Sequence, residues 1–493
     1  MRTRVRRVRA QEVISRVLER DVVARFLRPW LRQRDFLRLS QTSKGCLRES
    51  RAHLDELELC DGGVTDALIS SIVTQYPTLR KLELACDEED QITDAALFEV
   101  ARLSKLRDLD LDGYKFLSEA NVAALSEIWN RLESLHLREH DPDSVDHWPD
   151  AVVIKVAERC TNLRFLELCC DILTDATMTA VALHCVHLQS LSLIFVDRLS
   201  DAAIVTIVDQ CVHLRSIQLA ECEGLTDPVA ALENCQTLEE IDIEGIRITD
   251  ASIRNLGRGG ALTSIRMTDG TKDVEISDAS VIPLLTRCIS LRTLSLQGRD
   301  MAVTNASVSA IARSCPELRE LELGYGLNIH GVSVALLTSR CSKLRKLALS
   351  GVDIGDTSCE AIARDLGDLR SLELQTHQIT NRGLAQLAHC PRLRAFYLKS
   401  ASVSDAGIRA FSRLESFNLR NNMGVTPSGI RALLSRCPNL QELSLFQCLL
   451  FPPDEREKIR QSIKESHPAV YEDMAHHHDQ RAYSNEDTDL RMR

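Results

Sequence analysis

The chain repeats one pattern of hydrophobic and polar positions sixteen times. Each copy contains a Leu-x-x-Leu-x-Leu segment, in which Ile, Met or Phe sometimes replaces an internal Leu. The sixteen segments begin at Leu54, Leu79, Leu106, Leu132, Leu163, Leu188, Leu214, Leu238, Leu262, Leu291, Leu318, Leu344, Leu369, Leu393, Leu414 and Leu440. Their mean spacing of about 26 residues is typical of leucine-rich repeats. The alternation of apolar and variable residues predicts a strand with one buried face.

A helix is predicted between successive strands. A Thr-Asp or Ser-Asp step follows many of the strands, as in ITDAAL at 92–97 and LTDATM at 173–178. These side chains can accept the free N–H groups at the start of a helix. Helical periodicity follows, and a Cys often ends it, as in CVHL at 185–188 and 211–214. We therefore predict an α/β leucine-rich-repeat solenoid, a horseshoe with parallel strands on the concave face and helices on the convex face.

The pattern also divides the chain into parts. The predicted parts are a flexible basic segment (1–14), a helical module (15–52), about 16 repeats (53–451), a capping helix (452–466) and a disordered polar tail (467–493). Polar inserts at 139–150 and 268–275 lengthen two repeats. Insertions in solenoids often project from the binding face, so Trp148 is a candidate loop contact.

The distribution of charge and the number of cysteines limit the classes of protein to which the chain can belong. Residues 1–52 carry 15 Lys and Arg against 5 Asp and Glu, a net charge of +10, whereas the whole chain has −11. The body is therefore strongly acidic, which argues against a nucleic-acid partner for it.

The 17 cysteines are odd in number, recur once per repeat and follow no secretory leader. These features predict buried free thiols and a cytoplasmic or nuclear location. No apolar stretch reaches the ~18–20 residues of a membrane span.

The sequence contains no motif typical of an enzyme. A P-loop, an HExxH zinc motif, paired CxxC motifs and a nucleophile elbow are all missing from it. We expect no catalytic activity, no cofactor, no metal site and no small-molecule substrate. The function should therefore be the binding of another protein.

The segment before the repeats has more large apolar residues than it can bury alone. Two or three short helices in about fifty residues form only a small core. The residues at helical spacing are Leu18, Val22, Val23, Phe26, Leu27, Trp30, Leu31, Phe36, Leu37 and Leu39. They must pack on the end of the solenoid or on another protein.

This segment resembles an F-box, and the repeats resemble the cysteine-containing repeats of F-box/leucine-rich-repeat proteins. Residues 34–44 (RDFLRLSQTSK) match the F-box pattern R-D-L-x-x-L-S-x-x-S-K, whereas Glu19 and Cys46 stand at the usual Pro and Trp positions. The resemblance implies that the ten apolar residues bind a Skp-type adaptor, and through it a cullin. The chain would then be the substrate-recognition subunit of a Skp–cullin–F-box ubiquitin ligase. The alternative is a ubiquitin-independent scaffold or inhibitor whose N-terminal helices only cap the solenoid.

Strand alternation predicts which side chains point away from the core. The third, fifth and seventh positions of each L-x-x-L-x-L-x segment do so. They include two acidic triplets, Asp108, Asp110 and Asp112, and Glu240, Asp242 and Glu244. The triplets indicate a groove for a basic segment of an unknown target protein, the alternative being a solvated strand face. Apolar residues at such positions are candidate contact anchors: Phe165, Ile194, Tyr397 and Phe446.

Overall fold

The computed structural model describes residues 55–446. Within this range it leaves out 60–64, 86–91, 114–121, 123–125, 139–147, 255, 269–275, 299–301, 325–328, 351–352, 400–401, 421 and 423. The predicted F-box-like module, the basic segment, the capping helix and the tail lie outside the described residues. So do most of the two polar inserts. The chain forms two compact units, Met1–Pro228 (unit 1) and Val229–Arg493 (unit 2).

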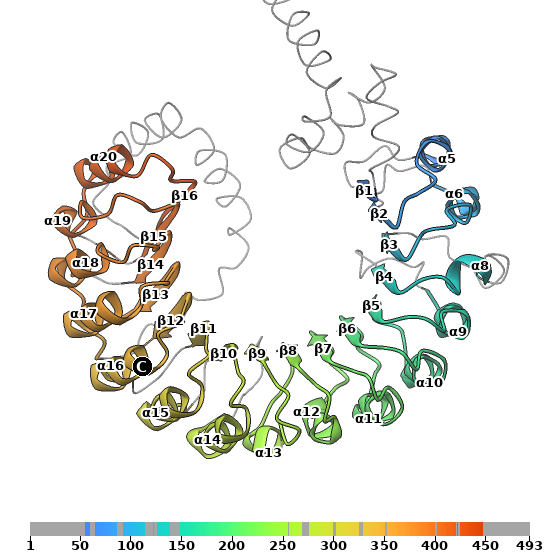
Figure 1. Ribbon diagram of the computed structural model, residues 1–493, viewed down its shortest axis with the longest axis horizontal. Helices are drawn as coiled ribbons and strands as arrows, with labels where there is room; N and C mark the ends of the chain where they lie inside the picture. Colours follow the sequence, from blue (N-terminus) through green and yellow to red (C-terminus); the bar gives the residue numbers. More distant parts are fainter. Residues whose placement is uncertain are drawn as a thin grey trace, which may run out of the picture. The chain divides into compact units, whose positions relative to one another are not determined.

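Unit 1 is a stack of strand–helix repeats in which the parallel strands pair in sequence order (Figure 1). Its strands are β1 (Glu56–Leu59), β2 (Lys81–Ala85), β3 (Asp108–Asp112), β4 (Ser134–Arg138), β5 (Phe165–Cys169), β6 (Ser190–Ile194) and β7 (Ser216–Ala220). Its helices are α5 (Asp66–Gln75), α6 (Asp94–Val100), α8 (Ser126–Trp129), α9 (Asp150–Arg159), α10 (Asp175–His184) and α11 (Asp201–Gln210). The helices form a second layer beside the strands.

Unit 2 contains the same strand–helix repeats, which follow α12 (Pro228–Ala231) and a 3-10 turn (Leu232–Asn234). Its strands are β8 (Glu240–Glu244), β9 (Ser264–Thr268), β10 (Thr293–Gln297), β11 (Glu320–Leu323), β12 (Lys346–Ser350), β13 (Ser371–Gln375), β14 (Ala395–Lys399), β15 (Ser416–Arg420) and β16 (Glu442–Phe446). Its helices are α13 (Asp250–Arg254), α14 (Asp278–Arg287), α15 (Asn305–Ser314), α16 (Gly331–Arg340), α17 (Asp356–Asp365), α18 (Asn381–Leu387), α19 (Asp405–Ile408) and α20 (Pro427–Arg436). These nine strands are also parallel and in sequence order.

The two units confirm the predicted leucine-rich-repeat solenoid. In β5, Leu166 and Leu168 are buried, whereas the alternating Phe165, Glu167 and Cys169 are partly exposed. The register aligns the buried leucines of neighbouring strands, so each unit has one continuous aliphatic core. Burial of each such leucine contributes about 2 kcal/mol to stability.

The cysteines end the helices as predicted. Cys160, Cys185 and Cys211 follow α9, α10 and α11 directly, and all three are buried free thiols. The Cys185 thiol donates to the carbonyl of Cys160 at 3.6 Å, and that of Cys211 to the carbonyl of Cys185 at 3.9 Å. The cysteine ladder therefore joins one repeat to the next.

Two helices of unit 2, α13 and α19, are shorter than the ten-residue helices of other repeats. The repeat that begins at Leu393 is only 21 residues long, and α19 in it has only four residues. The five-residue α13 is followed by Gly257 and Gly260, whose φ angles are +75° and +68°. This left-handed conformation strongly favours glycine, so it ends the helix. Along the described part of the chain, no helix has the length and apolarity to cross a membrane.

Candidate protein-binding surface

Strand register brings the outward-facing side chains of unit 1 into rows. The central row contains Glu83, Asp110, His136, Glu167, Ser192 and Gln218, from β2 to β7 in order. The first four are ionisable, whereas Ser192 and Gln218 bond to each other at 3.1 Å. The central row is therefore ionisable on β2–β5 and neutral on β6 and β7.

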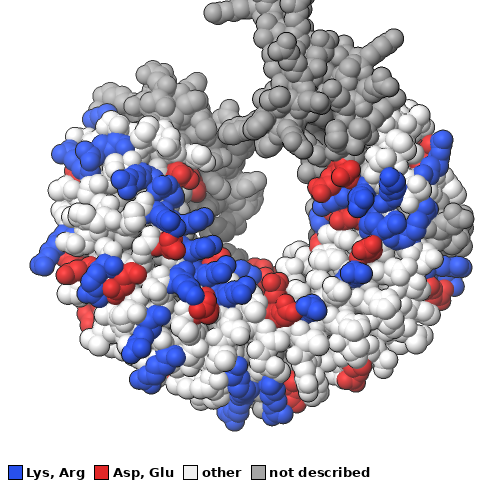
Figure 2. Space-filling model, in the orientation of Figure 1, with Lys and Arg blue, Asp and Glu red and all other residues white. Residues whose placement is uncertain are grey.

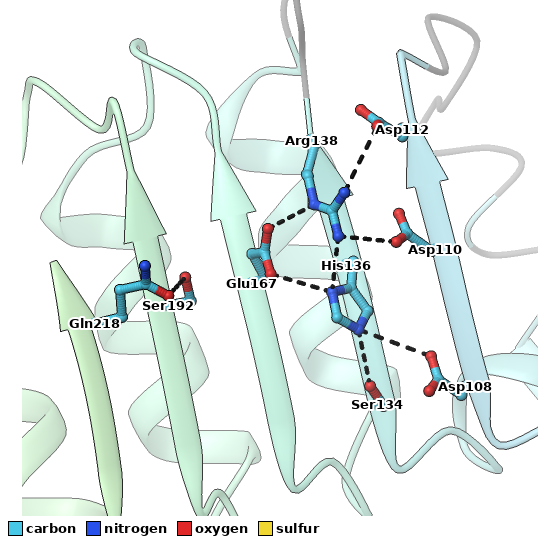
Figure 3. Close-up of polar contacts among 9 residues, drawn as sticks. All are labelled: Asp108, Asp110, Asp112, Ser134, His136, Arg138, Glu167, Ser192 and Gln218. Carbon is cyan, nitrogen blue, oxygen red and sulfur yellow. Dashed lines mark hydrogen bonds and ion pairs between the residues drawn. The ribbon is translucent and has the colours of Figure 1, made fainter. Parts of the chain in front are cut away.

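A network that we name the β3–β5 charge cluster occupies the charged part (Figure 3). It consists of Asp108, Asp110, Asp112, His136, Arg138 and Glu167. Arg138 lies between the acids of two strands: its Nε is 2.5 Å from Glu167 Oε1, and its Nη2 is 3.0 Å from Asp110 Oδ2. Its Nη1 is 3.6 Å from Asp112 Oδ2. One guanidinium thus links three carboxylates.

His136 contacts Glu167 on one side of its ring and Ser134 and Asp108 on the other. Its Nδ1 is 3.2 Å from Glu167 Oε2, and its Nε2 is 3.1 Å from the Ser134 hydroxyl and 3.8 Å from Asp108 Oδ1. Both ring nitrogens of His136 therefore have polar partners. The ring also packs on Phe165, with centroids 4.6 Å apart.

Burial and pairing act on these carboxyl groups in opposite directions. Burial raises the pKa of Asp110 to about 6, despite the nearby positive charge of Arg138. Burial alone would also raise the pKa of Glu167, but hydrogen bonds from His136 and Arg138 lower it overall. Burial tends to lower the pKa of Arg138, and the carboxylates of Asp110 and Glu167 raise it above its usual value. In this cluster the ion pair between Arg138 and Glu167 is therefore favourable, whereas ionisation of the buried Asp110 carboxyl group is unfavourable.

The first acidic triplet is less available than the sequence suggests. Asp110 and Asp112 point away from the core as predicted, but only 2% and 6% of their surfaces are exposed. The prediction of two open carboxylates is wrong there, because Arg138 from β4 lies between them and β5 (Figure 3). Asp108 is half-buried.

The second acidic triplet, in unit 2, is open. Glu240 and Glu244 are exposed, and Asp242 between them is half-buried. No ion pair or hydrogen bond joins any of the three to another described side chain. Burial raises the pKa of Asp242, Arg266 opposes this, and the like charge of Glu244 adds to it. Arg266 therefore offsets part of the charge of Asp242, whereas Glu240 and Glu244 present exposed negative charge that no described side chain pairs.

The predicted apolar anchors have different surroundings. Phe165, Ile194 and Tyr397 are half-buried, and the side chain of Phe446 lies outside the described part. Phe165 packs on His136, whereas Arg420 lies over the Tyr397 ring at 5.9 Å.

Trp148 is only 2% exposed, so the interpretation of this residue as a projecting contact is wrong. Most of the 139–150 insert that contains it lies outside the described residues, but the indole itself belongs to the core just before α9. A large apolar ring at the start of a helix gains more from burial than from exposure.

Sequence reasoning missed three residues of this surface. His136 and Arg138 occupy outward-facing positions of LESLHLR at 132–138, where the same alternation rule identifies them. Phe195, directly after β6, is 54% exposed and has a left-handed φ of 52°. The repeat pattern contains no signal for this conformation.

The described residues offer no group of three or more His, Cys, Asp or Glu side chains arranged to hold a metal ion. The arrangement on both units is one of fixed charges and half-buried rings on rigid parallel strands. Such a surface is suited to the recognition of another macromolecule.

Comparisons with known proteins agree with the repeat assignment. A family model described as "Leucine Rich repeat" matches residues 340–363. Coronatine-insensitive protein homolog 2 from rice (Oryza sativa subsp. indica) is 28% identical over 190 residues, which are 34% of this chain and 32% of that protein. F-box protein SKIP1 from Arabidopsis thaliana is 28% identical over 154 residues, which are 27% of this chain and 49% of that protein. The chain thus spans less than half of either relative. At this low identity, the resemblance to F-box/leucine-rich-repeat proteins is confirmed.

Solved structures with similar architecture include an internalin (inlF) from Listeria monocytogenes, at a TM-score of 0.41 and 17% identity over 78% of this chain and 93% of that chain. They also include the Rad7 and Elc1 complex from yeast, at a TM-score of 0.38 and 17% identity over 86% of this chain and 92% of that chain.

Proposed function

We propose that this chain is the substrate-recognition subunit of a Skp–cullin–F-box ubiquitin ligase. The N-terminal helices bind a Skp-type adaptor, and the repeats bind a target protein. The chain performs no chemistry itself; it raises the effective concentration of the target near the ubiquitin donor. It acts in the cytoplasm, the nucleus or both.

One observation carries the proposal. An F-box-like stretch at 34–44 stands directly before a cysteine-type leucine-rich-repeat solenoid, and a relative of the chain is named an F-box protein. The order of the two parts fits a receptor that binds the adaptor at one end and the target along the repeats. The rigid strand face, with its fixed charges, supports the target-binding half of the proposal.

The open β8 triplet is the proposed site for a basic segment of the target. The β3–β5 charge cluster already satisfies much of its charge through Arg138. Glu240 and Glu244 form no ion pair with a described side chain, and Asp242 has only the nearby charge of Arg266, which itself pairs with Glu320. Lys or Arg side chains of a target gain most where negative charge is exposed and unmatched.

The proposal is tested with full-length chain and purified Skp-type adaptor. The wild type is expected to retain the adaptor in a pull-down, and the triple variant Phe26→Ala, Leu27→Ala, Trp30→Ala should lose it. The variant Glu240→Gln, Glu244→Gln is the matched control, because it changes only the proposed target site and should still bind the adaptor. Failure of the wild type to bind, or equal binding by the triple variant, excludes the ligase role and favours a ubiquitin-independent scaffold.

A further inference from the structure

Phe195 has an unusual backbone conformation for an aromatic residue. It follows β6 directly, and its φ of 52° lies in the left-handed region. Glu221, which follows β7 directly, has a φ of 50°. In the part of the chain that the structure describes, these two are the only residues other than glycine with a positive φ. The left-handed conformation brings the Cβ atom close to the following carbonyl oxygen, so it is costly for a bulky side chain.

Glycine stands at the same position in two other repeats. Gly113 follows β3 with a φ of 66°, and Gly245 follows β8 with a φ of 67°. The backbone N–H of each glycine donates to the carbonyl of the last residue of the next strand, at 2.9 and 3.0 Å. The Phe195 N–H donates in the same way at 2.9 Å. Because the turn forms equally well with glycine, the fold does not require the Phe195 ring.

Burial does not account for the Phe195 ring either. The next residue, Val196, is fully buried, whereas Phe195 is 54% exposed. Among the described residues, no other aromatic ring and no cation pairs with it. An aromatic ring normally gains from burial, so this residue gives up both that gain and a relaxed backbone. A strained conformation that the fold does not need points to a function at this position.

The two turns that hold Phe195 and Glu221 are acidic. Residues 195–199 and 221–225 contain three acids and one base, a net charge of −2: Asp197, Glu221, Glu223 and Arg198. The turns contact each other, because the Glu223 N–H donates to Asp197 Oδ1 at 3.1 Å. The Glu221 side chain is half-buried, and its carboxylate forms no ion pair or hydrogen bond with any described residue. An exposed apolar ring therefore stands next to an unmatched negative charge.

We propose that Ile194, Phe195 and Glu221, which we name the β6–β7 turn site, bind a target segment in which an apolar side chain stands beside a Lys or Arg. The apolar side chain packs on Phe195 and on the half-buried Ile194, and the cation pairs with Glu221. Phe195 and Glu221 follow the register partners Ile194 and Ala220, whose strands lie about 4.8 Å apart. An extended segment advances about 3.3 Å per residue, so neighbouring residues of the target reach both positions.

The site rests on the proposed target-binding role of the repeats and adds the chemistry of the target segment. A nucleic acid is disfavoured, because the acidic turns repel a phosphate backbone. Binding at this site is measurable without adaptor or ligase. Failure of the wild type to bind the adaptor would overturn the ligase role alone, whereas failure of the peptide experiment would overturn only the β6–β7 turn site.

The test is fluorescence anisotropy with the full-length chain and a labelled peptide in which two Leu-Arg pairs stand between Gly and Ser residues. We expect the Kd to rise about tenfold in Phe195→Gly and in Glu221→Gln, because each variant loses one of the two contacts. Phe195→Gly should unfold at about the wild-type urea concentration, since release of the backbone strain offsets the lost partial burial of the ring. A residue needed only for the fold would instead lose stability.

Leu183→Ala is the matched control. Leu183, near the end of α10, is 66% exposed. Figure 2 shows few charged side chains over α10 and α11 on the face in view, so this leucine offers an apolar contact in weakly charged surroundings. Its loss should change the Kd less than twofold. A second peptide, in which Glu replaces each Arg, should bind the wild type at least tenfold more weakly, because its carboxylates repel Glu221.

Four results would overturn the inference. The first is equal affinity of the wild type and Phe195→Gly for the Leu-Arg peptide. The second is an equal loss of affinity in Leu183→Ala, which would indicate unspecific apolar binding. The third is a fall in the urea midpoint of Phe195→Gly as large as that of Val196→Ala, which would make the ring structural. The fourth is self-association of the wild type in sedimentation that Phe195→Gly abolishes, which would identify a second copy of the chain as the occupant.

Discussion

Asp278, the first residue of α14, accepts two hydrogen bonds from Thr304, which caps the helix of the next repeat. The Thr304 backbone N–H and hydroxyl donate to it at 2.9 and 2.5 Å. The Thr304 hydroxyl in turn accepts from the N–H of Ala306 at 3.2 Å. Thr174 and Thr380 are bound in the same way by Asp150 and Asp356. The Ser277-Asp278 step therefore caps its own helix with the Ser hydroxyl and supports the next repeat with the Asp carboxylate.

Replacement of Asp278 by Ala should weaken the junction between the two repeats. Asp278 also accepts from the Ser307 hydroxyl at 2.6 Å, so the change leaves several donors without an acceptor. We expect the free energy of unfolding to fall by about 2 kcal/mol. Asp278→Asn should lower the free energy of unfolding by less, because the Asn305 side-chain oxygen accepts equivalent hydrogen bonds from His330 and Ser333. Urea unfolding followed by circular dichroism measures both, and equal losses would show that the negative charge, not the acceptor geometry, is essential.

The stability that Asp278 provides should depend on pH. Burial would raise its pKa, but hydrogen bonds from Ser307 and Thr304 lower the pKa below the usual value. A carboxyl whose pKa is lowered by folding stabilises the protein above its unfolded pKa of about 4, and this contribution is lost as the pH falls through the folded pKa. The difference in unfolding midpoint between wild type and Asp278→Ala should therefore shrink below pH 4.

Asp110 should show the opposite dependence. Its pKa is raised to about 6, so between about pH 4 and 6 the folded chain keeps a proton that the unfolded chain releases. Stability therefore falls as the pH rises through this window. Asp110→Asn removes the cost and should raise the free energy of unfolding at pH 7.5 by about 1–2 kcal/mol, with no gain at pH 4. A loss at pH 7.5 in urea titrations would show that the Arg138 pair outweighs the burial.

The repeat pattern was sufficient to predict the strands, because each buried Leu recurs at a fixed place and alternation defines the two faces. The same rule located the outward-facing acids, but it could not predict their exposure. Asp110 is covered because a long side chain, Arg138, reaches across from the next strand, and such contacts depend on rotamers rather than on spacing. Trp148 shows the same limit, since a polar flank suggested a loop while the ring itself packs in the core.

The cysteine ladder should resist modification. Burial raises the pKa of Cys185, Cys315 and Cys341 to about 12 each, so very little thiolate forms at pH 8. We expect iodoacetamide to label these residues at least tenfold more slowly than the half-buried Cys169 and Cys235. Peptide mass spectrometry at early times gives the rates for each site. Labelling of Cys341 as fast as that of Cys169 in native buffer would show that the repeats open locally.

The β8 triplet offers the sharpest test of the outward face. Glu240→Gln with Glu244→Gln removes two exposed charges that no described side chain neutralises, so affinity for a labelled peptide with four Arg residues should fall about tenfold at low salt. Most of this difference should disappear at 0.5 M NaCl, because exposed charges are screened. Glu320→Gln with Glu322→Gln is the matched control: these acids lie on the same face of unit 2 but pair with Arg266 and Lys346. Their loss should leave the affinity within twofold, since the peptide would have to displace an internal cation to reach them. If both double variants weaken binding equally in anisotropy titrations, the peptide responds to the net charge of the unit and the triplet is not a distinct site.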